Sequence, residues 1–411
     1  MESYSYLHLG EPSDPDNYVV CKYRVSTDLP MEKAAEAIAA EQSTGTWTGI
    51  STLDRTIFDH LGARITSIEG DVVTAEFPVD DFSIEVGSVP QILSVISGNL
   101  FGLGALKGVR LEDVTFPKAI LEQFKGPKFG AAGLRKALNR PEKPLVGTIV
   151  KPKIGLSPEK TAEYVYEAGA GGLTNSKDDE TLVDQAFCPI EDRTVKVAEA
   201  LDRLESEGHL MMHAINVSTR GDRIVELAEK VQSWGARELM VDVITCGFGA
   251  VQALAEDPSI KIPVHVHRTM HGAFTKDPHH GVAMLPLTKL VRMVGGDALH
   301  IGTLGVGKMS GGKDESGNLA ACLGDDVPYR TVMPVCSGGV HPGLVGEIIK
   351  RSGMDVQIQA GGGVAGHPDG VRGGAMAMSQ AVDAAFLGIP AKEYAKDHPE
   401  LAKAIGAWGS I

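Results

Sequence analysis

The sequence predicts an α/β protein in which a (β/α)8 barrel follows a smaller N-terminal α+β domain. Eight short apolar runs recur between residues 145 and 360, helical stretches separate most of them, and the preceding part of the chain lacks this alternation. Regular alternation of strands and helices is typical of parallel sheets, and eight such units fit a closed barrel. A doubly wound open sheet is the competing arrangement, but no early G-x-G-x-x-G motif follows a strand.

The N-terminal domain is expected over residues 1–125. Segments 17–26 and 72–79 alternate apolar and polar residues, as strands do. Segments 31–42 and 90–100 have the periodicity of helices. A polar bridge that contains prolines, residues 125–144, leads into the barrel domain. We assign that second domain to residues 126–411.

The barrel strands are expected at the eight apolar runs. These are 145–150, 172–176, 210–215, 238–244, 263–266, 298–302, 332–337 and 356–360. The clearest helices between them are 157–170, 193–208 and 223–236. Barrel enzymes build their active sites where the strands end, so the residues that follow each run are the candidates for function.

Composition excludes some classes of partner. The net charge is −14, which disfavours binding to nucleic acid or to an anionic membrane, because such surfaces need a basic patch. No apolar stretch has the length of a membrane span, and the N-terminus does not resemble a signal peptide. The five cysteines are far apart and form no C-x-x-C motif, which favours reduced thiols in a cytoplasmic protein.

The ends of seven of the eight runs carry polar or glycine-rich sequence. In chain order the residues are Lys151 and Lys153; Lys177, Asp179 and Glu180; Asn216; His267, Arg268 and His271; His300; 337–339; and 361–363. In a barrel all of these positions meet at one rim. The sequence therefore predicts an active site there.

The segment GGLTNSKDDE, residues 171–180, is the strongest candidate for a metal site. A solvated turn is the alternative interpretation of its charges. On a strand, Lys177 and Asp179 share a face, Asp178 points away, and Glu180 can turn back toward them. Two carboxylates suit Mg²⁺, which prefers oxygen ligands. A free ammonium cannot be a ligand, so Lys177 is either a counter-ion or is converted by CO₂ into a carbamate.

Two candidate anion sites flank this metal site. Arg268 offers a planar fork of donors that suits phosphate, and glycine-rich turns after the seventh and eighth barrel strands are the usual phosphate site of this fold. Lys308 stands on a loop flanked by glycines. A structural histidine–arginine pair and merely flexible turns are the alternatives. Together the two sites indicate a bisphosphate substrate.

These motifs resemble the large subunit of ribulose-1,5-bisphosphate carboxylase/oxygenase (RuBisCO), most closely its archaeal form III type. The resemblance runs from about residue 18 to the end. It is carried by EQSTGTWT, SGNLFGLGALKGVRLED, GTIVKPKIGLS, GGLTNSKDDE, HVHRTMHGAF, HIGTLGVGKM, PVCSGGVHPG and IQAGGGVAGHPDG.

The resemblance implies roles for particular residues. Lys177 would be the lysine that CO₂ carbamylates, and Asp179 and Glu180 its companion Mg²⁺ ligands. Lys151 would assist enolisation and protonate the last carbanion, His267 would lie near the substrate hydroxyls, and Lys308 would steady the carboxylated intermediate. The remaining implied substrate contacts are Lys153, Arg268, His300, Ser337, Gly338, Gly361 and Gly362 in the barrel, and Glu41, Thr46, Trp47 and Asn99 in the N-terminal domain.

The resemblance also implies an activity and an assembly. The activity would be Mg²⁺-dependent enolisation of ribulose 1,5-bisphosphate and its carboxylation to two 3-phosphoglycerate, with O₂ as a competing substrate. Because the N-terminal residues complete the site of a neighbouring chain in this family, a homodimer or a multiple of dimers is expected.

The sequence departs from the family pattern at three places. DQAF, residues 184–187, replaces a more usual Gln-Pro-Phe, and the other two departures are single residues. Thr181 stands where an Asn is usual, and Ser310 stands where a Glu two residues after the loop lysine is usual. The alternative function is that of a RuBisCO-like enolase or isomerase on another sugar phosphate, such as a methylthio-ribulose or diketo-methylthiopentyl phosphate. Retention of Glu41, Asn99, His300 and Lys308 favours the carboxylase. A non-catalytic scaffold would not need four lysines at one rim.

Overall fold

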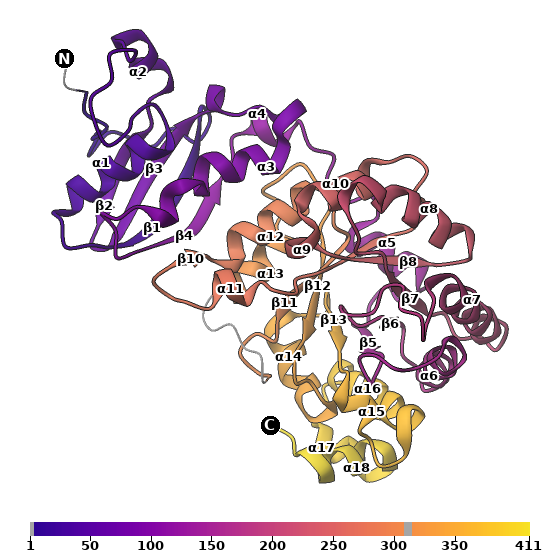
Figure 1. Cartoon of the computed structure of the whole chain (residues 1–411). Coiled ribbons are helices and arrows are strands. Elements are labelled where there is room, and N and C mark those ends of the chain that lie inside the picture. The colour runs from indigo at the N-terminus through magenta and orange to yellow at the C-terminus, as the bar shows by residue number, and fades with distance from the viewer. Residues whose placement is uncertain (1–3, 308–314) are drawn as a thin grey trace. The chain divides into compact units, whose positions relative to one another are not determined.

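The computed structural model describes residues 4–307 and 315–411, and the chain divides into two compact units (Figure 1). One unit comprises the residues up to Lys125 together with Met270–Leu290. The other comprises Gly126–Thr269 and Val291–Ile411. Each unit has a sheet and a core of its own.

The first unit is built on a mixed five-stranded sheet in the order β10-β4-β1-β3-β2. The strands are β1 (Tyr18–Ser26), β2 (Arg64–Glu69), β3 (Val72–Pro78), β4 (Gly108–Thr115) and β10 (Gly281–Val282). The helices are α1 (Met31–Gln42), α2 (Arg55–Leu61), α3 (Ile84–Ser97), α4 (Lys118–Leu121) and α11 (Gly272–Thr275). β1 pairs antiparallel with β3 and β4, whereas β10 pairs parallel with β4. The predicted α+β fold of this part of the chain is thus confirmed, and the structure adds that its sheet is mixed.

Helix α3 shows how a sequence signal can mislead about a boundary. Pro90 suggests a helix start because proline is favoured in a first turn. The helix instead begins at Ile84, and its backbone is interrupted at Ser88, where φ is 47° and ψ is −147°. The short turn before this kink was outside the predicted helix 90–100.

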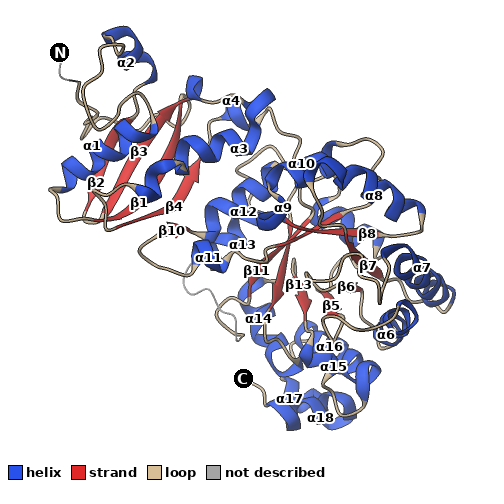
Figure 2. Cartoon of the chain, in the orientation of Figure 1, coloured by secondary structure: helices blue, strands red, loops and turns tan. Residues whose placement is uncertain are grey.

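The second unit contains the predicted barrel, which is closed and parallel (Figure 2). Its strands are β5 (Leu145–Ile149), β6 (Asn175–Lys177), β7 (Met212–Asn216), β8 (Glu238–Asp242), β9 (Val264–His267), β11 (Ala298–Gly302), β12 (Met333–Ser337) and β13 (Gln357–Gln359). All eight predicted runs contribute one strand. Closure occurs between β13 and β5, where Gln357 is paired with Leu145.

Helix α5 (Gly130–Ala137) precedes the first barrel strand, and the other helices of this unit follow barrel strands along the chain. These others are α6 (Pro158–Ala170), α7 (Ile190–Ser206), α8 (Ile224–Ser233), α9 (Val243–Cys246), α10 (Phe248–Glu256), α13 (Glu315–Leu323), α14 (Val345–Ser352), α15 (Gly362–Ala365), α16 (Gly370–Phe386), α17 (Ala391–Tyr394) and α18 (Pro399–Trp408). Helix α12 (Met284–Met293) begins in the first unit and ends in the second.

Apolar packing closes the N-terminal end of the barrel. The first residues of four strands form a buried cluster with three side chains that lie on or just after α5: Leu145, Met212, Ala298 and Met333 with Ala131, Leu134 and Leu138. Burial of such side chains stabilises the fold by about 1.5–3 kcal/mol each. The described polar residues of the barrel that are predicted to form the site lie at the opposite, C-terminal end of the strands.

Two global features agree with the composition. All five cysteines are free thiols. Among the described residues, no helix combines the length and the apolar character needed to cross a membrane.

Candidate active site

Two lysines that follow β5 lie against two carboxylates that follow β6. Lys151 Nζ is 2.7 Å from Asp179 Oδ2, and Lys153 Nζ is 3.1 Å from Glu180 Oε1. The parallel register explains the juxtaposition, since Ile149 at the end of β5 pairs with Lys177 at the end of β6. The hydrogen bond to Glu180 raises the pKa of Lys153, so this ammonium is charged at neutral pH.

Lys177 is enclosed at the end of β6. Its exposed fraction is 1%, and its Nζ donates to the Asp178 carbonyl at 2.8 Å and lies 4.0 Å from Glu180 Oε2. Burial lowers the pKa of this amine, against the opposing effect of nearby carboxylates. A buried amine with a lowered pKa is neutral more often, and only the neutral amine has the lone pair that attacks an electrophile.

For Glu180, the neighbouring groups outweigh the effect of burial on the pKa. Burial disfavours its ionised form, but a backbone hydrogen bond and the charges of Lys177 and Lys153 outweigh burial and hold the pKa of this carboxyl below its ordinary value. The group is therefore an oxygen donor at neutral pH. Thr181, the departure from the family pattern, donates its hydroxyl to Asp179 Oδ1 at 2.9 Å.

Asp178 points away from these groups, as the alternation along a strand predicts. Its carboxylate lies 3.1 Å from Arg193 on α7 and 3.1 Å from His213 on β7, and it accepts the Asn216 N–H at 3.0 Å. Burial would raise the pKa of Asp178, but Arg193 and His213 lower it to about 2. This fully buried network fixes the backbone from which Lys177 and Asp179 extend.

Three histidines gather on the adjoining strands. His265 and His267 come from β9 and His300 from β11, and the rings of His267 and His300 pack edge to face with centroids 4.8 Å apart. His267 Nδ1 is 3.0 Å from Asp242 Oδ1 at the end of β8. Burial and the charge of Lys177 lower the pKa of His267 to about 3, so its ring is neutral at physiological pH.

Arg268 is a buried cation just after the end of β9. Its exposed fraction is 9%, and within the described part of the chain no hydrogen bond or ion pair reaches its guanidinium. Burial lowers its pKa to about 10, and the charge of Glu315 opposes that effect. A buried charge without a hydrogen-bonded partner is costly, so the site is adapted to an anionic ligand.

The glycine-rich turns approach the site closely. A Cβ on Gly361 would stand 2.9 Å from the Lys151 side chain, so this lysine packs against the turn after β13. Gly338 follows β12 with a φ of 112°, a conformation that glycine adopts readily. Its carbonyl lies beside Gly307, the last described residue before Lys308. Ser337, at the end of β12, is 2.6 Å from His300 Nδ1. Gly362 begins α15.

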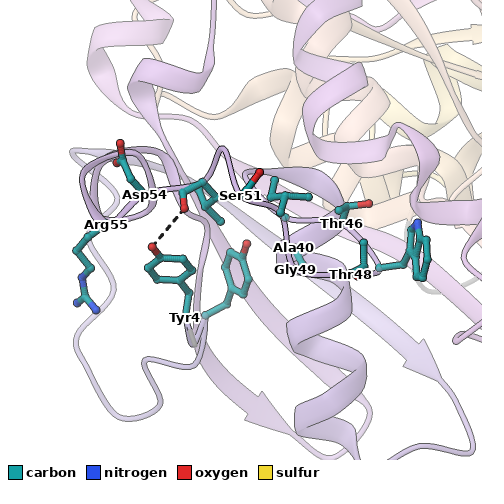
Figure 3. A pocket seen from close by; sticks show the side chains of 13 residues that line it. Tyr4, Ala40, Thr46, Thr48, Gly49, Ser51, Asp54 and Arg55 are labelled. Atoms are coloured by element: carbon teal, nitrogen blue, oxygen red, sulfur yellow. Dashed lines mark hydrogen bonds between the residues drawn. The ribbon is translucent and has the colours of Figure 1, made fainter. Parts of the chain in front are cut away.

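The four predicted N-terminal residues belong to the other compact unit. Asn99 Nδ2 donates to Glu41 Oε1 at 3.4 Å. Thr46 and Trp47 line a cavity of about 690 Å³ in that unit, where the Tyr4 hydroxyl donates to the Leu53 carbonyl at 3.4 Å (Figure 3). The Trp47 side chain has an exposed fraction of 92%.

Two of the residues singled out from the sequence fall outside the described part of the chain, and four residues of the site were not predicted. Lys308 and Ser310 lie outside the described residues. The residues that sequence reasoning missed are Asp242, His265, Arg193 and His213. Asp242 lies inside the fourth predicted run, 238–244, but it is the last residue of β8, so a strand end placed two residues earlier would have found it. The other three are recognisable only from their contacts.

The described residues supply two carboxylates that suit a hard cation. Within residues 4–307 and 315–411 no group of three or more His, Cys, Asp or Glu side chains is arranged to hold a metal ion. Asp179 and Glu180 supply carboxylate oxygens of the kind that Mg²⁺ prefers. A carbamate on Lys177 would supply the third anionic group.

Family models match both parts of the chain. The model described as the ribulose bisphosphate carboxylase large chain, catalytic domain, matches residues 130–408, and that of the N-terminal domain of the same chain matches residues 9–120. The ribulose bisphosphate carboxylase of Methanocaldococcus jannaschii is 40% identical over 98% of this chain and 99% of its own length. That of Pyrococcus abyssi is 40% identical, with coverage of 99% and 96%.

Solved structures agree with these sequence relatives. The octameric Rubisco from Pyrococcus horikoshii OT3, determined as a complex with sulfate ion, has a TM-score of 0.92 at 38% identity, covering 98% of this chain and 96% of that one. The dimeric archaeal Rubisco from Hyperthermus butylicus has a TM-score of 0.90 at 36% identity and covers 99% of both chains.

Proposed function

The chain belongs to the ribulose bisphosphate carboxylase large-chain family, and from this premise we propose that it carboxylates ribulose 1,5-bisphosphate to two molecules of 3-phosphoglycerate. The reaction is Mg²⁺-dependent, and O₂ competes with CO₂ for the same enediolate. Burial of Lys177 beside Asp179 and Glu180 is the observation that carries this proposal.

Lys177 is the first group to react. Its neutral amine attacks the carbon of CO₂, an N–C bond forms, an electron pair moves to oxygen, and one proton leaves. The product is an anionic carbamate with oxygen donors where an ammonium stood. The lowered pKa of Lys177 supports this step because it increases the fraction of neutral amine at a given pH.

The carbamate of Lys177, Asp179 and Glu180 would hold the metal. When bound, Mg²⁺ supplies a Lewis acid that stabilises negative charge developing on the substrate's oxygens. In the structure described here Lys151 and Lys153 pair with the two carboxylates. These lysines are then available to the substrate once the carboxylates take up a metal.

The bisphosphate is held at both of its ends. Arg268 binds one phosphate, and the turns at Gly338, Gly361 and Gly362 bind the other through backbone N–H groups. His300, whose two ring nitrogens are engaged by His265 and Ser337, lines the same site. The buried guanidinium of Arg268 supports this assignment, because an anion would give it the partner that the described residues do not provide.

The remaining contacts orient the sugar. Ser337 and Lys153 contact it from the barrel, and Lys308 steadies the carboxylated intermediate. A second copy of the chain supplies four further residues: Glu41, Thr46, Trp47 and Asn99. The active unit is therefore a homodimer or a multiple of dimers, in keeping with the dimeric and octameric states named for the similar archaeal structures.

Proton transfers are divided between side chains of the barrel. The carbamate on Lys177 takes the proton from C3 of the substrate, which leaves an enediolate. His267, neutral at physiological pH, accepts or donates hydrogen bonds at the middle hydroxyls. CO₂ adds to C2 of the enediolate and a water molecule adds to C3. The C2–C3 bond then breaks, C3 leaves as a carboxylate, and Lys151 protonates the carbanion that remains at C2. Exclusion of water protects the enediolate from early protonation.

The proposal is tested by incubating the chain with ribulose 1,5-bisphosphate, Mg²⁺ and labelled bicarbonate. We expect acid-stable label in 3-phosphoglycerate. Lys177→Ala should abolish both fixation and exchange of the C3 proton with solvent. Lys308→Ala should spare exchange and block fixation, because it acts after the enediolate forms. Exchange without fixation in the unaltered chain would instead indicate the enolase-type alternative, and fixation by both variants would refute the assigned roles.

A further inference from the structure

A line of buried polar side chains crosses four neighbouring barrel strands. Glu238 Oε1 on β8 is 3.7 Å from His265 Nδ1 on β9. His265 Nε2 is 2.8 Å from His300 Nε2 on β11, and His300 Nδ1 is 2.6 Å from Ser337 Oγ at the end of β12. The line therefore begins at the first residue of β8, deep in the barrel, and ends at the candidate active site.

Glu238 and His265 are buried side chains whose facing polar atoms lack hydrogen bonds. Their exposed fractions are 1% and 0%. Neither carboxylate oxygen of Glu238, nor Nδ1 of His265, has a hydrogen-bond partner within the described part of the chain. Since an unsatisfied buried polar atom is costly, these groups are each other's natural partners. A small rotation of either side chain closes the 3.7 Å separation into a direct hydrogen bond.

When both rings are neutral, the contact between the two imidazoles admits only two proton orders. A neutral imidazole has one N–H donor and one bare acceptor nitrogen. Burial and the neighbouring histidines hold the pKa of His300 well below its usual range, so this ring is neutral. Two Nε2 atoms 2.8 Å apart share a single proton. Either His300 donates to His265, or His265 donates to His300.

The two orders have opposite consequences for Ser337. If His300 carries its proton on Nε2, its Nδ1 is an acceptor and the Ser337 hydroxyl donates back to it. The lone pairs of Ser337 Oγ then face the site. If His300 carries its proton on Nδ1, it donates to Ser337, and the serine hydroxyl is free to donate to a ligand.

We propose that Glu238 is a positioning residue that makes Ser337 a hydrogen-bond acceptor toward a substrate hydroxyl. A carboxylate has only acceptors, so it selects the His265 tautomer with the proton on Nδ1. His265 Nε2 is then bare, His300 donates to it, and Ser337 donates to His300. The part of this proposal that concerns substrate rests on the proposed function, since it requires a polyol phosphate at Ser337.

The tautomers themselves can be measured without substrate. In the chain labelled with ¹⁵N-histidine, nitrogen chemical shifts distinguish N–H from bare imidazole nitrogens, and loss of signals in His265→Gln and His300→Gln assigns the rings. We expect His265 to be protonated on Nδ1 and His300 on Nε2. The opposite order in the unaltered chain would overturn the proposal whether or not the protein is a carboxylase.

A substitution of Glu238 should reverse the order. In Glu238→Leu a protonated Nδ1 of His265 would face an apolar group, so the proton should move to Nε2 and His300 should become protonated on Nδ1. Glu76→Leu is the matched control, because Glu76 is a fully buried strand carboxylate of the other unit with one oxygen that accepts no hydrogen bond. Glu238→Leu with unchanged tautomers would also overturn the proposal.

Kinetics test the consequence at Ser337. Glu238→Leu should raise the KM for ribulose 1,5-bisphosphate about three- to tenfold, as for one misdirected hydrogen bond, and change kcat less than about twofold. In a Ser337→Ala background the same substitution should leave KM unchanged, since no hydroxyl remains to be directed. An equal rise in both backgrounds would contradict the role of Ser337. Failure of the unaltered chain to fix carbon refutes the proposed function but leaves the tautomer result standing.

Discussion

At the scale of the residue, Arg268 links ligand binding to stability. It is a buried guanidinium without a hydrogen-bonded partner in the described residues. Replacement of a buried charge of this kind by an apolar side chain of similar volume is often stabilising. The same replacement removes the donor fork that suits phosphate. Stability and binding should therefore respond to one substitution in opposite directions.

We expect Arg268→Met to raise the free energy of unfolding of the ligand-free chain by about 1–3 kcal/mol. The KM for ribulose 1,5-bisphosphate should increase by at least about tenfold, because a charge-assisted hydrogen bond is lost. Urea denaturation and steady-state kinetics provide the two measurements. Arg372→Met, at an exposed ion pair with Glu167, is the control and should change neither quantity appreciably. A destabilised Arg268→Met chain would show that the guanidinium has a partner.

The histidines predict how stability depends on pH. The folded-state pKa of His300 lies well below 6.5, whereas an unfolded histidine titrates near about 6.5. As pH falls below 6.5 the unfolded chain gains a proton that the folded ring does not, so the folded state loses stability. Each such histidine contributes about 1.4 kcal/mol per pH unit to this slope.

We expect His300→Gln to reduce the slope of the unfolding free energy against pH between pH 6 and 4 by about 1.4 kcal/mol per pH unit, which corresponds to one proton. The measurement is the free energy of unfolding in urea at several pH values. His8→Gln is the control, because this histidine is in an i,i+3 contact with Glu11 at the surface. An unchanged slope would mean that His300 is protonated in the folded state.

At the scale of the element, the register of β6 is held by a buried ion pair. Asp178 and Arg193 have side chains with 0% exposure, and they join the strand to α7. Removal of one partner from a buried pair leaves an uncompensated charge and typically costs about 3–5 kcal/mol. Because Lys177 and Asp179 flank Asp178, this pair also positions the candidate metal ligands.

We therefore expect Arg193→Met to destabilise the chain by about 3–5 kcal/mol, and Asp178→Asn combined with it to cost clearly less than the sum of the single changes. Unfolding in urea measures each term of this double-mutant cycle. Lys196→Met, in an exposed pair with Glu199 on the same helix, should cost less than about 1 kcal/mol. Additive losses would show that Asp178 and Arg193 do not act together.

The strands of the barrel were the most predictable elements. A short apolar run predicts a buried parallel strand, and the polar residues that follow it mark where the strand ends. All eight predicted runs form strands. Predictions failed where a boundary depends on a backbone angle, as at Ser88 in α3. The two-residue strand β10 carries no periodicity, and its pairing with β4 arises only from tertiary contact.

In the candidate site, too, residues in local sequence patterns were predicted, whereas contacts between distant parts of the chain were not. Strand ends and family motifs pointed to Lys151, Lys177 and Asp179 from sequence, because their spacing is local. The pairing of Asp178 with Arg193, or of His265 with His300, joins residues on different strands and helices. Such contacts follow from barrel closure, and a single sequence does not specify them residue by residue.

At the scale of the whole molecule, the proposed function requires two chains. If Glu41 completes the site of a neighbouring chain, a chain with Glu41→Gln and a chain with Lys177→Ala should each be inactive as homodimers. A mixed dimer contains one site with both changes and one site with neither. Random pairing of equal amounts then restores about a quarter of the unaltered activity.

This complementation is measured as carbon fixation after co-expression of the two variants. Mixing Lys177→Ala with Lys151→Ala is the matched control, because both residues lie in the barrel unit. That mixture should restore no activity, since one chain must contribute both residues to a site. Equal recovery in the two mixtures would mean that the site is not shared as proposed.

The central claim is that Lys177 becomes a carbamate. The most direct test is ¹³C NMR of the chain with ¹³CO₂ and Mg²⁺, comparing the unaltered chain with Lys177→Arg. We expect a carbamate carbon resonance that Mg²⁺ strengthens and that is absent from the variant. If the resonance is missing from the unaltered chain, or persists in Lys177→Arg, the carbamate and the metal site built on it are wrong.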